Sequence, residues 1–168
     1  MHSTASIWVD ASPRDLFDLV SDLSRWESRL PHYRYVRILG QTNGTTRAAM
    51  SARRGWIPVF WEAEKTQDSE TRTIRFRHVR GITRGMDVVW SFTPERGGTL
   101  ARVEHDLTFR VPLVGDWLAE RVIARGFIEP IVAKTLACFR AIAEGRAGEG
   151  AGGRARTGDR EAAGDRAS

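Results

Sequence analysis

The spacing of apolar residues changes from strand-like to helical late in the chain, and this change constrains the fold more than any other feature. Apolar and polar side chains alternate in six runs: 33–41, 45–53, 57–67, 71–80, 85–95 and 100–110. A period of two indicates strands that bury one face. From Leu113 to Glu144 the apolar residues recur at helical spacing instead, which predicts a long helix after the last strand.

The joins between these runs are short and contain residues that favour turns. They are Asn43-Gly44, Arg54-Gly55, Asp68-Ser69, Gly81 and Arg96-Gly97-Gly98. Short joins of this kind connect neighbouring antiparallel strands, because parallel strands need long crossovers. The six runs are therefore expected to form an antiparallel meander.

Ahead of the meander, one β-prone run at 5–9 is followed by two helix signals. Ser12 is a suitable N-cap, Pro13 suits the first helical position, and Asp15 completes a capping box. A second short helix is expected at 22–30, where a proline follows.

The long C-terminal helix contains a proline. Pro130 cannot donate to the carbonyl of Gly126, so a kink or a break is expected there. The sequence thus predicts an α+β fold: a curved antiparallel sheet of about seven strands wraps around the C-terminal helix, with two short helices after strand one. A sheet of this kind seldom closes fully around one helix, so a cavity between them is the expected ligand site.

The composition changes at Gly145. Residues 145–168 contain no apolar side chain larger than alanine, with five arginines and four acidic residues. Such a segment cannot bury enough surface to offset its ordering entropy. We therefore expect a single domain at 1–144 and a disordered tail at 145–168.

Composition excludes several other classes of protein. A single cysteine, Cys138, rules out a disulfide within the chain and is expected to be a packed core thiol. The first ten residues do not resemble a signal peptide, and no run reaches the ~18 apolar residues of a membrane span. We expect a cytoplasmic protein without integral membrane contact. No metal or cofactor is predicted, because the sequence has no His-Glu-x-x-His, paired-cysteine, phosphate-loop or GxSxG pattern.

Alternation along the strands separates an inner face from an outer face. The inner face is expected to hold Val59, Trp61, Ala63, Lys65, Ile74, Phe76, His78, Met86, Val88, Trp90, Phe92, Val103, His105, Leu107 and Phe109. The outer face then holds charges of both signs, including Arg75, Arg77, Arg102 and Arg110. Mixed charges are typical of cross-strand pairing and of a solvated face, so nucleic acid is not an expected partner.

Several inner positions are more polar than packing requires. Lys65, His78, His105 and Arg80 carry ionisable groups on this face, and Tyr33 begins the second strand. Each one alone is compatible with a hydrogen-bonded core or rim residue. Together, in a cavity lined by aromatic side chains, they are the pattern expected of a small-molecule site.

At this point the chain resembles a known family. Residues 5–144 are similar to the START-like helix-grip superfamily and, within it, to the polyketide cyclase/dehydrase group. The resemblance is carried by "IWVDASPRDLFDLVSDLSRWESRLPHYRYVRIL" with its Asp22-x-x-x-Trp26 pattern, by "RTIRFRHVRG", and by "MDVVWSFTPERGGTLARVEHDLTFRVPL" with the closing helix. It implies a helix-grip fold that encloses a hydrophobic small molecule.

Two branches of the superfamily imply different functions. Aromatase/cyclases guide a poly-β-ketone chain through aldol closure and dehydration, and this chain matches their pattern at Trp26, Tyr33, Trp61 and Trp90. Lys65 and His78 stand where that pattern has two arginines, and Val103 stands where it has a further tryptophan. The coenzyme Q-binding and lipid-carrier group is the alternative, because "DLTFRVPLVGDWLAERVIARGFIEPIVAKTLACFRAIAE" resembles its last strand and helix.

The cyclase hypothesis assigns a role to each candidate residue. Tyr33 and His78 would exchange protons with ketone and enol oxygens, while His105 and Lys65 would orient or polarise carbonyls. The ligand would be held by Trp26, Trp61, Phe76, Trp90, Val103, Phe127 and Ile131. A polyketide intermediate would be the ligand, delivered by an acyl carrier protein; a carrier would instead bind a lipid, isoprenoid or quinone without chemical change. A third hypothesis, a nucleic-acid or protein-partner module, would use the outer arginines.

Overall fold

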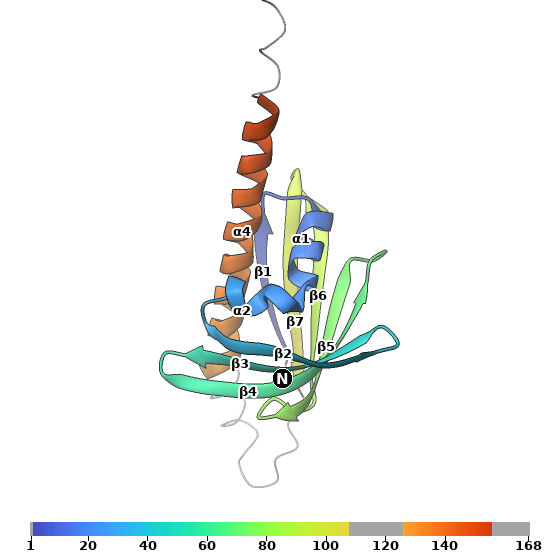
Figure 1. The fold of residues 1–168 in the computed structure, drawn as a ribbon, viewed down its shortest axis with the longest axis vertical. Helices are drawn as coiled ribbons and strands as arrows, with labels where there is room; N and C mark the ends of the chain where they lie inside the picture. The colour runs from blue at the N-terminus through green and yellow to red at the C-terminus, as the bar shows by residue number, and fades with distance from the viewer. Residues whose placement is uncertain (1, 108–125, 156–168) are drawn as a thin grey trace, which may run out of the picture.

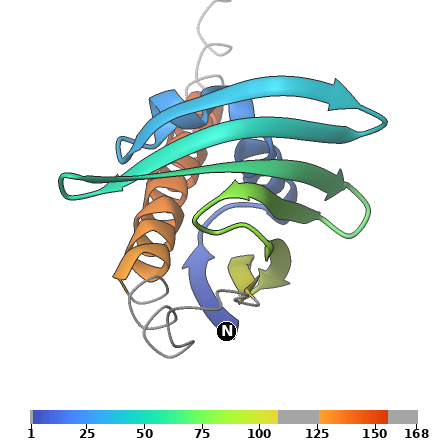
Figure 2. The ribbon, with the colours of Figure 1, turned by 90° about the horizontal axis from the view of Figure 1, so that it is seen from below.

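The structure, a computed structural model, describes residues 2–107 and 126–155. Its sheet contains the strands β1 (His2–Val9), β2 (Tyr33–Thr42), β3 (Thr45–Arg54), β4 (Ile57–Asp68), β5 (Thr73–Gly81), β6 (Met86–Glu95) and β7 (Gly98–Leu107). The strand order is β1-β7-β6-β5-β4-β3-β2, and every neighbouring pair is antiparallel. The predicted meander is confirmed over these residues. The first strand, β1, pairs with the last strand, β7, and forms one edge of the sheet (Figures 1 and 2).

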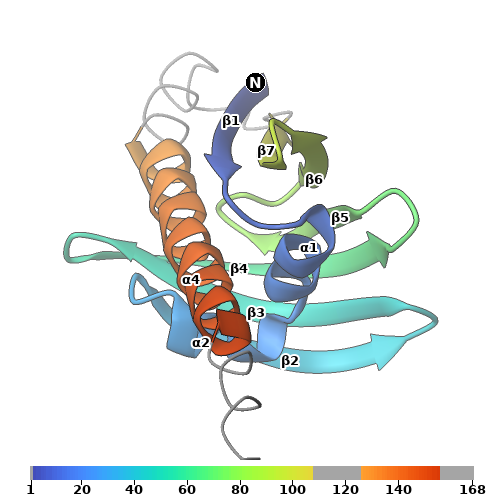
Figure 3. The ribbon, with the colours of Figure 1, turned by 90° about the horizontal axis from the view of Figure 1, so that it is seen from above.

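The helices occupy the concave side of this curved sheet. They are α1 (Pro13–Ser21), the 3₁₀ turn η1 (Leu23–Arg25), α2 (Trp26–Arg29) and the long α4 (Glu129–Ala155). Figure 3 shows α1 and α4 on the same side of strands β2 to β4. The fold is thus a seven-stranded antiparallel sheet curved around a long helix, with short helices after β1, as predicted.

The N-terminus of α1 confirms the predicted cap. The backbone N–H of Asp15 donates to Ser12 Oγ at 3.1 Å, and Ser12 Oγ donates to Asp15 Oδ2 at 2.7 Å. Pro13 occupies the first helical turn, where its missing N–H has no cost. This cap fixes where the chain turns from β1 toward the concave side.

Helix α4 agrees with the prediction near Pro130 and extends further than predicted at its C-terminal end. Its α-helical part begins at Glu129, directly after a wider turn at 126–128, so the change in helix geometry falls next to Pro130, where a kink or break was expected. The predicted helical residues 113–125 lie outside the described residues. At its other end α4 reaches Ala155, past the predicted boundary at Gly145; the division into domain and tail stays a prediction.

Glycine is required at one turn beside the cavity. Gly81 ends β5 with a φ of 97°, and a Cβ there would collide with the carbonyl oxygen of Phe60 on β4. Only glycine allows both the backbone conformation and this close approach. The turn that follows carries residues 82–85 over the end of the sheet.

Apart from Arg80, the inner faces pack as predicted wherever their side chains are described. Trp26 lies at the centre, with ring centroids 5.5–6.3 Å from four neighbouring aromatic rings: Tyr33, Phe76, Trp90 and Phe139. Its indole Nε1 donates to the carbonyl of Val20 at 2.8 Å, which satisfies the buried donor. Leu107 and Phe109 were also expected on this face, but their side chains lie outside the described part.

The outer face carries the expected cross-strand ion pairs, with one correction. Arg77 contacts Asp87 at 3.2 Å, and Arg47 contacts Glu62 at 2.9 Å. Arg80 was placed on the inner face by simple alternation, and this prediction is wrong: its side chain is 72% exposed and pairs with Glu62 at 3.0 Å. A register shift between the β4 residues Glu62 and Ala63 changes the pairing with β5, and alternation fails across such a bulge.

Candidate ligand-binding cavity

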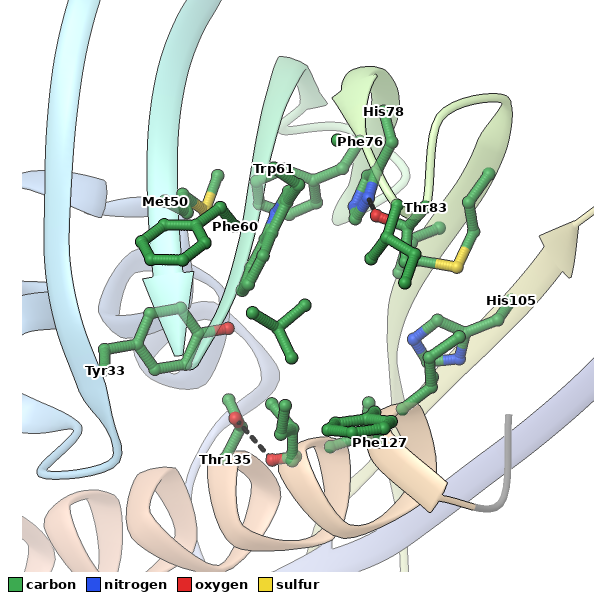
Figure 4. A pocket seen from close by; sticks show the side chains of 18 of the residues that line it. Tyr33, Met50, Phe60, Trp61, Phe76, His78, Thr83, His105, Phe127 and Thr135 are labelled. Atoms are coloured by element: carbon green, nitrogen blue, oxygen red, sulfur yellow. Dashed lines mark hydrogen bonds between the residues drawn. The ribbon is translucent and has the colours of Figure 1, made fainter. Parts of the chain in front are cut away.

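A cavity of about 480 Å³ lies between the concave face of the sheet and α4. Strands β4, β5 and β6 form most of its wall, β7 contributes one histidine, and the start of α4 closes the remaining side (Figure 4). Nine of the eleven predicted site residues line it: Trp26, Tyr33, Trp61, Phe76, His78, Trp90, His105, Phe127 and Ile131. The cavity is therefore aromatic and aliphatic, with a few polar groups that face its interior.

His78 is held firmly in the cavity wall. It is 7% exposed, its Nδ1 lies 2.7 Å from Thr83 Oγ1, and its ring stacks on Trp61 with an interplanar angle of 6°. Burial, with a smaller contribution from the nearby His105, lowers the pKa of His78 to about 3. The imidazole is thus neutral at pH 7 and is fixed in orientation by two contacts.

His105 reaches the cavity from the inner face of β7. It is 4% exposed and makes no hydrogen bond to any residue that the structure describes. Burial, assisted by the charge of His2, lowers the pKa of His105 to about 4. A neutral buried imidazole that has no hydrogen-bond partner among residues 2–107 and 126–155 is suited to hydrogen-bond a ligand.

Tyr33 faces these histidines from the other side of the cavity (Figure 4). Burial raises the pKa of its hydroxyl, and a hydrogen bond with Thr135 opposes part of that shift. Tyr33 therefore remains a neutral phenol that can donate a hydrogen bond.

Thr135 contacts a buried histidine that the sequence analysis missed. Its Oγ1 donates to the carbonyl of Ile131 at 2.8 Å and lies 2.8 Å from Nε2 of the buried His32. Since the hydroxyl proton is used on Ile131, Nε2 of His32 must carry the proton of this second bond. Burial and the charge of Lys134 lower the pKa of His32. No sequence signal marked His32, because it lies in the two-residue connection between Leu30 and Tyr33.

Two predicted site residues do not line the cavity. Lys65 lies on the inner face as expected, but its Nζ donates to the carbonyl of Ser21 at 2.6 Å and to Gln67 Oε1 at 2.5 Å. Burial lowers the pKa of its ammonium group, and Asp22 counteracts this. Val103 is fully buried between Ala5 and Trp90 in the sheet. Lys65 thus links β4 to the end of α1, and Val103 is a core residue.

Thr83 is a further polar residue of the site that the sequence analysis did not select. It is 4% exposed, lines the cavity, and comes from the turn that begins after Gly81. The two glycines that flank it, Gly81 and Gly85, could have indicated a tight turn here. In the structure both have a positive φ, which glycine adopts readily. The hydroxyl of Thr83 forms the hydrogen bond that orients the imidazole of His78.

A match to a protein-family model establishes the family of this chain. Residues 9–139 match the family described as "Polyketide cyclase / dehydrase and lipid transport". The chain belongs to this family. Membership of this cyclase/dehydrase and lipid-transport family, together with the helix-grip fold and the apolar cavity, identifies a protein that binds hydrophobic ligands.

Solved structures with low sequence identity share the fold. The Zhui aromatase/cyclase from Streptomyces sp. R1128 aligns with a TM-score of 0.77 at 19% identity, over 88% of this chain and 95% of that chain. TTHA0849 of Thermus thermophilus aligns with a TM-score of 0.72 at 20% identity, covering 84% and 95%. The 18 kDa protein CC1736 from Caulobacter crescentus aligns with a TM-score of 0.69 at 20% identity, covering 88% and 99%. At these identities the likeness concerns the fold alone.

The cavity of this family member offers neutral hydrogen-bonding groups on aromatic walls. Within residues 2–107 and 126–155, no carboxylate, arginine or lysine lines it. In the same residues, no group of three or more His, Cys, Asp or Glu side chains is placed to hold a metal ion. None of the described helices is both long and apolar enough to cross a membrane. These groups are suited to hydrogen-bond the ketone or hydroxyl groups of an uncharged ligand.

Proposed function

We propose that this protein is a polyketide cyclase/dehydratase of the aromatase/cyclase type, which folds a neutral poly-β-ketone chain and promotes its ring closure. The observation that carries the proposal is the convergence of Tyr33, His78 and His105 on one aromatic cavity (Figure 4). The shared fold with a Streptomyces aromatase/cyclase supports it. A cytoplasmic acyl carrier protein would deliver the chain.

The proposed reaction needs only proton movements. His78 removes a proton from a methylene carbon between two ketones, and the Tyr33 hydroxyl donates a hydrogen bond to the enolate oxygen that forms. The enolate carbon attacks a second carbonyl, one C–C bond forms as the carbonyl π bond breaks, and the new alkoxide takes up the proton that His78 removed. Loss of that hydroxyl with a neighbouring proton releases water and leaves a cyclic enone, and enolisation of the remaining ring ketones gives the aromatic ring. His105 orients the attacked carbonyl.

The aromatic walls determine which carbons meet. Trp61 is fixed by its stack on His78, and Trp26 and Trp90 lie with their ring centroids 6.3 Å apart. A poly-β-ketone held between rigid rings loses its conformational freedom when it binds, and not later in the transition state. Such preorganisation contributes much of the rate acceleration of intramolecular reactions. Lys65 has no part in this proposal because it does not line the cavity.

A second candidate function is non-catalytic carriage of a lipid, isoprenoid or quinone. The pKa values near 3 and near 4 of His78 and His105 favour it, because a general base is most effective when its pKa lies near the working pH. The printed description of the family also includes lipid transport. A carrier needs only the apolar cavity.

Turnover of a poly-β-ketone substrate distinguishes the two functions. The purified protein is mixed with the substrate, and cyclised products are separated by chromatography and compared with the spontaneous products. His78→Ala should lower turnover strongly and leave affinity within a few fold. His2→Ala is the matched control, because His2 is an exposed histidine outside the cavity.

The ligand class is tested in parallel by titration with a naphthol-type polyketide mimic, a short-chain ubiquinone and a mixed-sequence oligonucleotide. The cyclase proposal expects saturable binding of the mimic and a product distribution that changes with His78→Ala. Binding of the quinone alone, with unchanged products, would make the protein a carrier. Binding of the oligonucleotide alone would contradict both functions.

A further inference from the structure

Four large apolar side chains are exposed around the mouth of the cavity. Trp56 is 89% exposed, Ile82 60%, Phe60 47% and Ile57 38%. Ile57, Phe60 and Ile82 also line the cavity, so they lie where it meets solvent, and Trp56 precedes Ile57 in the turn between β3 and β4. We call these four residues the apolar rim. The turns that carry it lie toward the end of the molecule where α4 begins (Figure 1).

The charged side chains of the two segments that carry the apolar rim, 53–61 and 78–86, are all positive. Arg53 and Arg54 flank the first turn, Arg84 lies in the second, and neither 53–61 nor 78–86 contains an acidic residue. Arg53 and Arg84 are exposed and form no ion pair within the described residues. Arg54 is also exposed, and its guanidinium donates to the carbonyl of Gly126 and lies over the ring of Phe127.

We propose that the apolar rim docks on the surface of an anionic phospholipid bilayer, which places the mouth of the cavity against the lipid. Tryptophan and aliphatic side chains are stable at the boundary between head groups and acyl chains. Arginines beside them are attracted to anionic head groups, by about 1 kcal/mol per charge near the surface. A hydrophobic ligand would then pass between bilayer and cavity without crossing water; this consequence rests on the proposed hydrophobic ligand, whereas the docking does not.

The shape of the apolar rim favours a bilayer over a protein. A stable protein interface buries roughly 800 Å² on each partner with a matched surface, whereas the apolar rim is four side chains on the start of β4 and on the turns at 55–56 and 82–85. A second copy of this chain would bring the same arginines face to face, and like charges repel. A bilayer requires no matched shape and carries the complementary charge.

Sedimentation with vesicles tests this docking with the full chain and no cavity ligand. The protein should bind vesicles of phosphatidylcholine with phosphatidylglycerol, bind pure phosphatidylcholine more weakly, and lose binding as salt is raised. Trp56→Ser should weaken binding about tenfold, which corresponds to removing one large apolar side chain from the lipid. Leu39→Ser is the matched control: Leu39 is 54% exposed on β2 and does not line the cavity.

Arginine variants separate the charge from the apolar contact. Arg53→Gln combined with Arg84→Gln should remove most of the preference for anionic vesicles, whereas Arg75→Gln combined with Arg102→Gln on the outer face should keep it. Quenching of Trp56 fluorescence by brominated lipid should be lost in Trp56→Ser and unchanged in Leu39→Ser.

Several results would overturn the docking. The wild type could fail to sediment with anionic vesicles at low salt, or Leu39→Ser could weaken binding as much as Trp56→Ser. A wild-type dimer that Trp56→Ser converts to a monomer would assign the apolar rim to a second copy. Binding of a purified acidic carrier protein without vesicle binding would assign it to a protein partner. Titration of the naphthol mimic without vesicles reports the cavity alone, so vesicle binding without mimic binding would refute the proposed function and retain the docking.

Discussion

Mild acid should destabilise this fold through two cavity histidines. Burial lowers the pKa of His78 from 6.5 to about 3 and that of His105 from 6.5 to about 4. Below pH 6.5 the unfolded chain binds protons on both imidazoles, while the folded chain does not. The stability gained by keeping them neutral is therefore complete above pH 6.5 and is lost as the pH falls toward the folded pKa values. Each group costs about 1.4 kcal/mol per pH unit in this window, so at about pH 5 the two together cost about 4 kcal/mol.

Urea unfolding at about pH 7 and at about pH 5 measures this cost. The comparison is between the wild type and His78→Gln/His105→Gln, because glutamine is polar and does not titrate. Both proteins share the effects of their carboxylates and of His32, so these cancel in the difference. The wild type should lose about 4 kcal/mol more than the double variant between the two pH values, whatever their stabilities at neutral pH. His2→Gln should lose slightly less than the wild type, because the charge of His2 contributes to the lowered pKa of His105.

Equal losses in the wild type and in the double variant would refute the reasoning. They would mean that the imidazoles reach water through the cavity mouth and titrate in the folded chain near their ordinary pKa. The titration of the histidine ring protons by NMR separates the cases directly, since each imidazole reports its own folded pKa.

Three further substitutions test the local accounts of the fold by urea unfolding. Gly81→Ala should destabilise by at least about 2 kcal/mol more than Gly85→Ala, because both have positive φ but only at Gly81 would the new Cβ strike backbone; similar losses would contradict the close approach to Phe60. Ser12→Ala should cost about 1 kcal/mol by removing the cap of α1, and a neutral result would show that the cap is dispensable. Thr135→Val should cost about 1–3 kcal/mol, because it leaves Nε2 of the buried His32 without its partner; no loss would mean that water replaces the hydroxyl.

The alternation of residue types predicted the faces of the strands, because side chains on a strand point alternately to its two sides. Phe76, His78 and Trp90 were placed on the inner face on that basis, and all three line the cavity. The same rule failed at Arg80, because the irregular register between β4 and β5 moves it to the outer face. Such a bulge leaves no mark in a pattern of polar and apolar letters.

The hydrogen-bond partners of the polar side chains were less predictable than the faces of the strands. Lys65 was expected among the site residues, yet its ammonium is held by the carbonyl of Ser21, an acceptor 44 residues away in the chain. The bond between His32 and Thr135 spans 103 residues. Contacts of this kind depend on how a short helix or connection packs against the sheet. The alternation of residues within one strand contains no information about that packing.

The most direct test of the central claim is calorimetric titration of the naphthol-type mimic into two variants of neighbouring residues on β6. Val88 is 6% exposed and lines the cavity, whereas Val89 lies on the opposite face of the strand, opposite Arg75 and Glu104 on its neighbours. Val88→Phe fills the cavity, and Val89→Phe adds the same atoms outside it. The account predicts saturable binding to the wild type and to Val89→Phe, and none to Val88→Phe. Unchanged binding by a folded Val88→Phe variant would contradict the claim that this cavity holds the ligand.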